Sequence, residues 1–155
     1  MKKLAILLST VCLSASVVSG ENLLLNGDFE TAGPTGWSSW TSGGSVSYNN
    51  NSQGNSTYYI NAWGGTWGNS AGWFQNVAVT EGVTYALKVD SATENWWSPE
   101  GKIGLQFKDA SGNNLENYEL VVANYANSLP WTTYTLMETA PANAASVNID
   151  LKFYG

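Results

Sequence analysis

Two short stretches of the chain each hold a pair of tryptophans suited to chemistry at a surface. Trp63 and Trp67 stand among Asn, Gly and Thr, and Trp96 and Trp97 are flanked by Asn, Ser and Pro. A flat indole offers a large apolar area and a negative π-face, and few rotatable bonds are frozen when it binds. These side chains suit stacking on the C–H face of a sugar ring. The alternative is that the loops fold over a sheet and bury their own rings.

Polar side chains on predicted strands are candidates for hydrogen bonds to the hydroxyl groups of such a ligand. Lys88 and Asp90 alternate with the apolar residues of 83–89, and Gln106 alternates with those of 103–107. Alternation with a period of two places them on the wet faces of two central strands. If these strands share one hollowed sheet, the three residues line one groove, with Gln106 as the preferred donor and acceptor. Otherwise they are solvated strand residues.

Carboxylates are the third group that could do chemistry. Asp28 and Glu30 share the same parity after the first predicted strand, and Asp150 lies in the last strand. Chain ends often lie close together in a small domain. Carboxylates gathered there would repel each other unless a hard cation such as Ca²⁺ joined them. The residues alone favour the simpler alternative, in which Asp28 forms a turn and Glu30 is a solvated acid. No pair of acids is marked as the facing pair that a glycosidase needs.

Composition excludes several classes of function. The 155 residues contain neither His nor Arg, and they carry a net charge of -6. Histidine-dependent catalysis and His-ligated zinc are therefore excluded. Binding to nucleic acid is not expected, because it needs a basic surface. The length corresponds to one ordinary domain.

Residues 1–20 have the pattern of a secretory signal peptide. Lys2 and Lys3 precede an apolar run over 4–13, and small residues follow it. The run is too short to anchor the chain in a membrane. Cleavage after Gly20 leaves a secreted or cell-surface domain over 21–155, and a cleavage site near Ser16 is the alternative. That domain has no cysteine and carries four lysines against twelve acids.

The rest of the chain predicts an all-β fold. Apolar residues alternate with polar ones over 83–89, 103–107 and 147–153, and clusters of Gly, Asn, Ser and Pro separate these runs. Residues 109–114 predict a hairpin turn, and residues 80–82 predict another turn. Roughly nine or ten strands of this kind predict an antiparallel two-sheet β-sandwich or jelly roll.

Three motifs in the expected order resemble carbohydrate-binding modules of the CenC type, the jelly-roll modules of families 4, 9, 16 and 22. The first is residues 22–30 (Asn-Leu-Leu-Leu-Asn-Gly-Asp-Phe-Glu) followed by Gly36-Trp37. The second is the strand-turn-strand pattern of 75–85. The third joins 131–134 (Trp-Thr-Thr-Tyr), 140–144 (Ala-Pro-Ala-Asn-Ala) and 147–150 (Val-Asn-Ile-Asp).

The resemblance implies a structural Ca²⁺ held near Glu30 and Asp150, with backbone carbonyls completing its ligands. Gly54 is similar in position to a glycine that donates such a carbonyl in the family. The family usually closes on two acids, and Leu151 replaces the second one here. That departure leaves the ligand set incomplete.

The sequence therefore predicts a secreted, monomeric, non-catalytic module that binds a polysaccharide or oligosaccharide. A neutral glycan of the β-glucan or xylan type is expected, since the acidic surface disfavours acidic glycans. A small glycoside hydrolase is the first alternative, and it requires two facing carboxylates in one cleft. A surface or matrix domain that binds other proteins is the second, and it requires a flat apolar patch.

Overall fold

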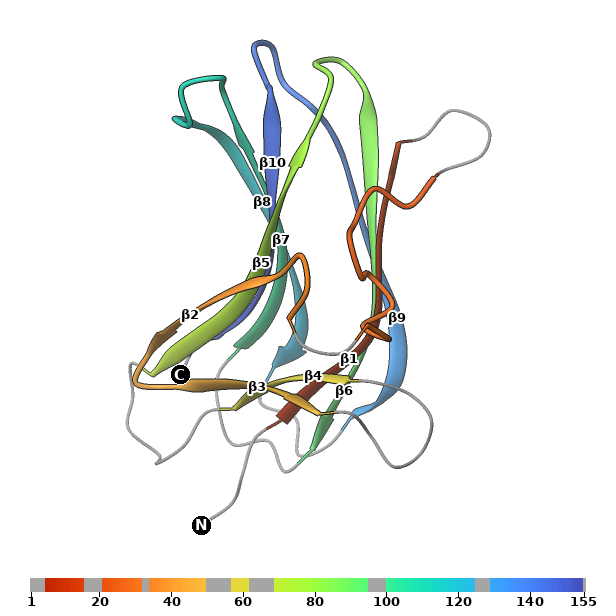
Figure 1. The fold of residues 1–155 in the computed structure, drawn as a ribbon, viewed down its shortest axis with the longest axis vertical. Helices are drawn as coiled ribbons and strands as arrows, with labels where there is room; N and C mark the ends of the chain where they lie inside the picture. Colours follow the sequence, from red (N-terminus) through yellow and green to blue (C-terminus); the bar gives the residue numbers. More distant parts are fainter. Residues whose placement is uncertain are drawn as a thin grey trace.

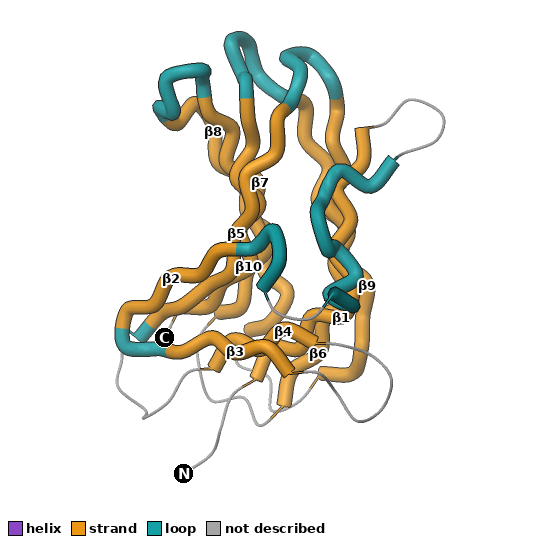
Figure 2. Tube along the Cα trace, in the orientation of Figure 1, coloured by secondary structure: helices purple, strands orange, loops and turns teal. Residues whose placement is uncertain are grey.

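The computed structural model describes residues 5–15, 21–31, 34–49, 57–61, 69–94, 100–124 and 129–154. The regular elements of these residues are strands (Figure 2). Across the described ranges, no helix is long and apolar enough to span a membrane. The strands are β1 (Ala5–Ala15), β2 (Ser38–Ser42), β3 (Ser45–Asn49), β4 (Thr57–Asn61), β5 (Ser70–Ala78), β6 (Thr84–Glu94), β7 (Glu100–Lys108), β8 (Asn114–Asn124), β9 (Leu129–Thr139) and β10 (Ser146–Tyr154).

The strands form two sheets that lie face to face (Figure 1). Sheet A has the order β3-β4-β1-β6-β9, and sheet B has the order β2-β5-β10-β7-β8. Every pairing between named strands is antiparallel. The predicted antiparallel two-sheet sandwich is therefore confirmed.

The core lies between the sheets and is built from the predicted alternation. The apolar residues of each run point inward and are at most 4 % exposed, while their polar neighbours point outward. Burying one such side chain stabilises the fold by about 1.5–3 kcal/mol. The inward residues are Tyr85, Leu87 and Val89 in β6, Ile103, Leu105 and Phe107 in β7, and Val147, Ile149, Leu151 and Phe153 in β10.

The hairpin turn predicted over 109–114 joins β7 and β8. The Asp109 carboxylate accepts hydrogen bonds from the backbone N–H groups of Ser111 and Asn113, both at 2.9 Å, and from the Asn113 side chain. The Asn113 bonds, the side-chain bond first, hold the pKa of Asp109 below 3.8. Gly112 adopts a φ of 84°, which a residue with a side chain rarely adopts. The turn fixes the register between the two strands.

The strand β1 lies within the segment predicted as a leader. It is placed between β4 and β6 in sheet A, where Val11 pairs with Val89. Ladder pairs run from Ala5 opposite Glu94 to Ala15 opposite Tyr85. In the full-length chain these residues are therefore part of the sheet, and their removal as a leader stays a prediction.

Candidate functional site

The described tryptophans differ in exposure. Trp37 and Trp73 are both buried at 5 % exposure. Trp131, near the start of β9, is 49 % exposed. The threonine-rich sequence after it, Thr132-Thr133-Tyr134-Thr135, is the signal that β9 has a wet face. The predicted stacking residues and the predicted carbonyl donor lie outside the described residues; these are Trp63, Trp67, Trp96, Trp97 and Gly54.

The outer face of sheet A brings Trp131 together with polar side chains of β6 and β9. Lys88 pairs in register with Thr135, and Asp90 pairs with Thr133. The Thr133 hydroxyl donates a hydrogen bond to the Asp90 carboxylate at 2.5 Å. Alternation along β9 places Trp131, Thr133 and Thr135 on the same side. We refer to these five residues as face A, an exposed indole beside hydroxyl, ammonium and carboxylate groups.

The prediction of one groove shared by Lys88, Asp90 and Gln106 is wrong. The strand that carries the first two, β6, pairs with β1 and β9 in sheet A, whereas β7 carries Gln106 and pairs with β10 and β8 in sheet B. Both strands turn their polar side chains away from the same core. Their wet faces therefore lie on opposite sides of the sandwich.

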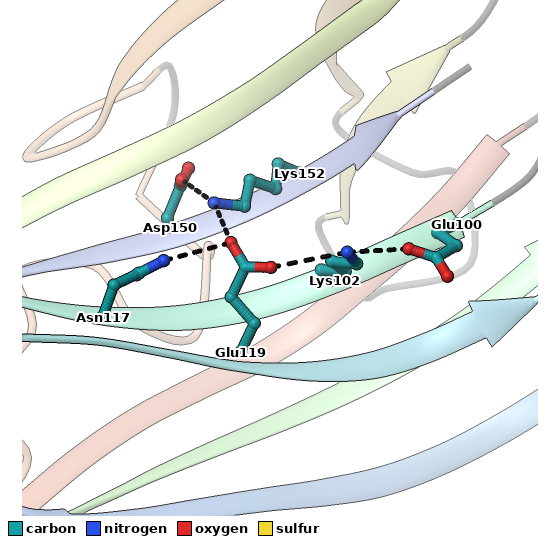
Figure 3. Close-up of polar contacts among 6 residues, drawn as sticks. All are labelled: Glu100, Lys102, Asn117, Glu119, Asp150 and Lys152. Atoms are coloured by element: carbon teal, nitrogen blue, oxygen red, sulfur yellow. Dashed lines mark hydrogen bonds and ion pairs between the residues drawn. The ribbon is translucent and has the colours of Figure 1, made fainter.

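The outer face of sheet B carries a chain of ion pairs (Figure 3). Lys152 Nζ lies 2.8 Å from a carboxylate oxygen of Glu119 and 2.8 Å from one of Asp150. Lys102 Nζ lies 2.7 Å from Glu100 and 3.4 Å from Glu119. The Lys152 side chain is only 7 % exposed, so the ammonium group at the centre of these ion pairs is largely removed from water. Each charge has a neighbour of opposite sign, with three carboxylates around two ammonium groups.

These contacts shift two ionisation equilibria. Burial alone raises the pKa of Glu119, but the hydrogen bond and charge of Lys152, with smaller contributions from Asn117 and Lys102, outweigh it and lower the pKa below 4.5. The hydrogen bond with Glu100 raises the pKa of Lys102 above 10.5. Both shifts favour the charged forms, as expected where carboxylates and ammonium groups lie in contact.

The N-terminal motif is a compact turn fixed to the core. The Gln75 side chain accepts a hydrogen bond from the Leu25 N–H at 2.8 Å and donates one to the Leu25 carbonyl at 3.0 Å. Phe29 has a φ of 60°, which is unfavourable for a bulky residue. Its ring is fully buried and lies 5.4 Å from the ring of Trp37. Core packing therefore holds the motif in a conformation that its backbone disfavours.

The predicted calcium ligands are not gathered by this arrangement. The Asp28 carboxylate accepts the Glu30 N–H at 3.2 Å, in a segment tied to the inward-pointing Gln75. Asp150 points to the opposite face of sheet B, where Lys152 neutralises it. No group of three or more His, Cys, Asp or Glu able to hold a metal ion occurs among the described side chains. The three carboxylates therefore do not fit one cation site here, and calcium stays a prediction from the resemblance.

Comparison with known proteins identifies the family. The family model described as a carbohydrate binding domain matches residues 21–154. No curated protein is significantly similar to the chain. Among solved structures, the enzymatically active domain of tailspike protein 4 from bacteriophage CBA120 matches with a TM-score of 0.61 and 21 % identity. The match covers 86 % of this chain but only 20 % of the tailspike chain, so it supports the fold alone. Because the family model spans almost the whole chain beyond residue 20, the chain belongs to this family of carbohydrate binding domains.

Proposed function

We propose that this domain is a non-catalytic module that binds a neutral polysaccharide on face A. Stacking on Trp131 orients the sugar ring, and the polar groups of β6 and β9 bind its hydroxyls. No bond of the glycan is broken. The ligand class proposed is a β-glucan or a xylan.

The exposure of Trp131 is the observation that carries the proposal. Trp37 and Trp73 are each 5 % exposed, whereas Trp131 is 49 % exposed. It precedes the outward-facing threonines of β9. The exposed area of this indole is apolar surface that a ligand can remove from water, which would favour binding. A pyranose presents C–H groups to such a ring and hydroxyl groups at its rim, which matches an indole beside the threonines of β9.

The polar groups of face A suit neutral sugars. Thr133 and Thr135 each offer a hydroxyl that can donate or accept, and Asp90 accepts. Lys88 supplies the cation of this set, while the chain as a whole carries a net charge of -6. Long-range repulsion therefore disfavours acidic glycans.

Substitution of the exposed indole tests the site. Trp131→Ala is expected to weaken binding to insoluble β-glucan or xylan by about tenfold or more, as for an aromatic anchor. Trp131→Phe should retain part of the affinity. Met137→Ala is the matched control, because Met137 is 55 % exposed further along the same strand. Pull-down isotherms measure the affinity, and thermal melting checks that each variant is folded.

Three results would contradict the proposal. Unchanged binding by Trp131→Ala would remove face A as the site. Release of reducing sugars by the purified domain would favour the hydrolase alternative. A protein-interaction domain would bind neither polysaccharide.

Secretion belongs to the same proposal. The match to the carbohydrate binding domain begins at residue 21, directly after the predicted leader, and this supports removal of residues 1–20. The mature domain would then keep nine of the described strands and lose β1 from sheet A. Sequencing the N-terminus of the secreted protein tests this, with a start near Glu21 expected. An N-terminus at Met1 would instead make β1 a permanent strand.

A further inference from the structure

Sheet A is completed by a strand from the segment predicted as a leader. The strand β1 lies between β4 and β6 (Figure 1). Val11 pairs with Val89 on one side, and Ile6 pairs with Ile60 on the other. Among the described strands β4 otherwise pairs only with β3, so β1 connects the β3-β4 pair to the rest of sheet A. Removal of residues 1–20 would therefore divide this sheet.

The gap left by β1 has the width of one strand. Because β1 is antiparallel to both neighbours, β4 and β6 run in the same direction on either side of it. Neighbouring strands lie about 4.8 Å apart, so β4 and β6 are separated by about twice this distance and cannot pair without moving. The backbone N–H and C=O groups of β6 that face the gap would lose their partners, which is unfavourable in a largely buried strand. We refer to this gap as the strand slot.

The side of β6 that faces the core has two parts along the strand slot. Leu87 and Val89 form the first part, and both are fully buried. The leader places the apolar residues Leu13 and Val11 opposite them in register. Ser91 continues the same side of the strand and is 1 % exposed. Its hydroxyl has no hydrogen-bond partner among the described residues. One half of the slot is therefore apolar, and the other half presents an unpaired polar group.

The leader does not complement the polar half of the strand slot. Leu8 is the residue that pairs with Ser91, and leucine can neither donate nor accept a hydrogen bond. The register of β1 against β6 also shifts here, between Leu8 and Thr10. Side chains directly opposite each other on one face have Cβ atoms about 4.5–5.5 Å apart, so a second hydroxyl in this position would reach Ser91. A strand with Ser or Thr opposite Ser91 would therefore fit better than the leader does.

From these observations we propose that removal of the leader opens the strand slot as a binding site for an extended segment of a partner protein. The segment adds a strand antiparallel to β6, with apolar residues opposite Leu87 and Val89 and a Ser or Thr opposite Ser91. In recognition of this kind, backbone hydrogen bonds supply affinity and alternate side chains supply specificity. The proposal rests on the removal of residues 1–20, which is part of the proposed function, but it uses no side chain of face A.

Exchange of the strand in the full-length chain tests the proposal. A protease site inserted after Gly20 allows the folded chain to be cut, and a fluorescent peptide of residues 2–15 that carries Cys12→Ser is then added. The peptide is expected to replace the leader and to elute with the protein on gel filtration. The same peptide with Val11→Lys is the matched control, and it should not bind because it places a charge opposite the buried Val89.

The polar half of the slot is tested with a third peptide and a variant of the protein. Leu8→Thr in the peptide should tighten binding by about threefold or more, because it gives Ser91 a partner. Ser91→Ala in the protein should abolish this advantage while both peptides still bind. Because the hydroxyl removed is buried without a partner, the melting temperature of Ser91→Ala should not fall. An advantage that persisted in Ser91→Ala would overturn the proposed register.

Hydrogen exchange locates the bound peptide. Backbone amides of β6 that face the slot should become protected when the peptide binds, and those of β8 should not change. Three results would overturn the proposal. The first is absence of peptide binding once the leader has been released. The second is protection at another sheet edge in place of β6. The third is protection of these β6 amides in the cut chain without leader or peptide, which would mean that the sheet closes by itself or with a second copy.

The outcomes are separable from those of the proposed function. Binding of polysaccharide through Trp131 is measured on the same cut chain, and its absence would overturn face A without affecting the peptide result. Failure of the peptide to bind would overturn the slot and keep face A. If the secreted protein kept Met1, the slot would never open in the natural protein, and the proposal would be overturned even with a peptide that binds the cut chain.

Discussion

Face A and the outer face of sheet B use the same alternation of side chains but treat their charges differently. The four described salt bridges all join residues on sheet B. On face A, Lys88 is exposed, and Asp90 accepts a hydrogen bond from the neutral Thr133. On sheet B both lysines lie against carboxylates, whereas on face A Lys88 is presented to solvent.

The two surfaces differ in whether their charged groups stabilise the fold or are available to a ligand. A nearly buried ammonium such as that of Lys152 contributes to the fold through its partners, because leaving either side unpaired costs free energy. An exposed lysine contributes little to stability, and its ammonium group is available to bind a ligand.

Removing one lysine from each surface should give the largest difference in stability between the two surfaces. Lys152→Met leaves Glu119 and Asp150 without their shared cation and is expected to lower the free energy of unfolding by about 3 kcal/mol. Lys88→Met on face A is the matched control, with an expected change of no more than about 0.5 kcal/mol. Urea unfolding of the two variants measures both values.

A compensated variant sharpens the same prediction. Adding Glu119→Gln and Asp150→Asn to Lys152→Met removes the orphaned charges and should restore part of the stability. Equal losses for Lys152→Met and Lys88→Met would show that the ion pairs contribute no more than exposed charges do.

The core was predictable from sequence because alternation is local information. Tyr85, Leu87 and Phe107 are buried as their period-two pattern predicts, and Asp109 forms the predicted turn. Each of these inferences needs only the nearest residues along the chain. The identity of the family likewise follows from short motifs, which the match over 21–154 confirms.

The pairing of surfaces was not predictable, because it depends on which sheet each strand joins. Lys88 and Gln106 occupy equivalent positions in consecutive strands, and nothing local shows that the chain changes sheets between them. The exposure of Trp131 and the partnership of Asp150 with Lys152 also depend on cross-strand neighbours. Alternation predicts which side of a strand faces solvent. It does not predict which sheet, and therefore which surface of the domain, that side belongs to.

A smaller effect is expected in the pH dependence of stability. The folded-state pKa of Glu119 lies below 4.5, so its stabilising contribution is present above that value and is lost as pH falls through the folded pKa. Glu119→Gln should therefore be less stable than the wild type near neutral pH, and the two curves should converge in acid. Thermal melting between pH 7 and about pH 3 measures this convergence. A constant difference at all pH values would assign the loss to packing instead of charge.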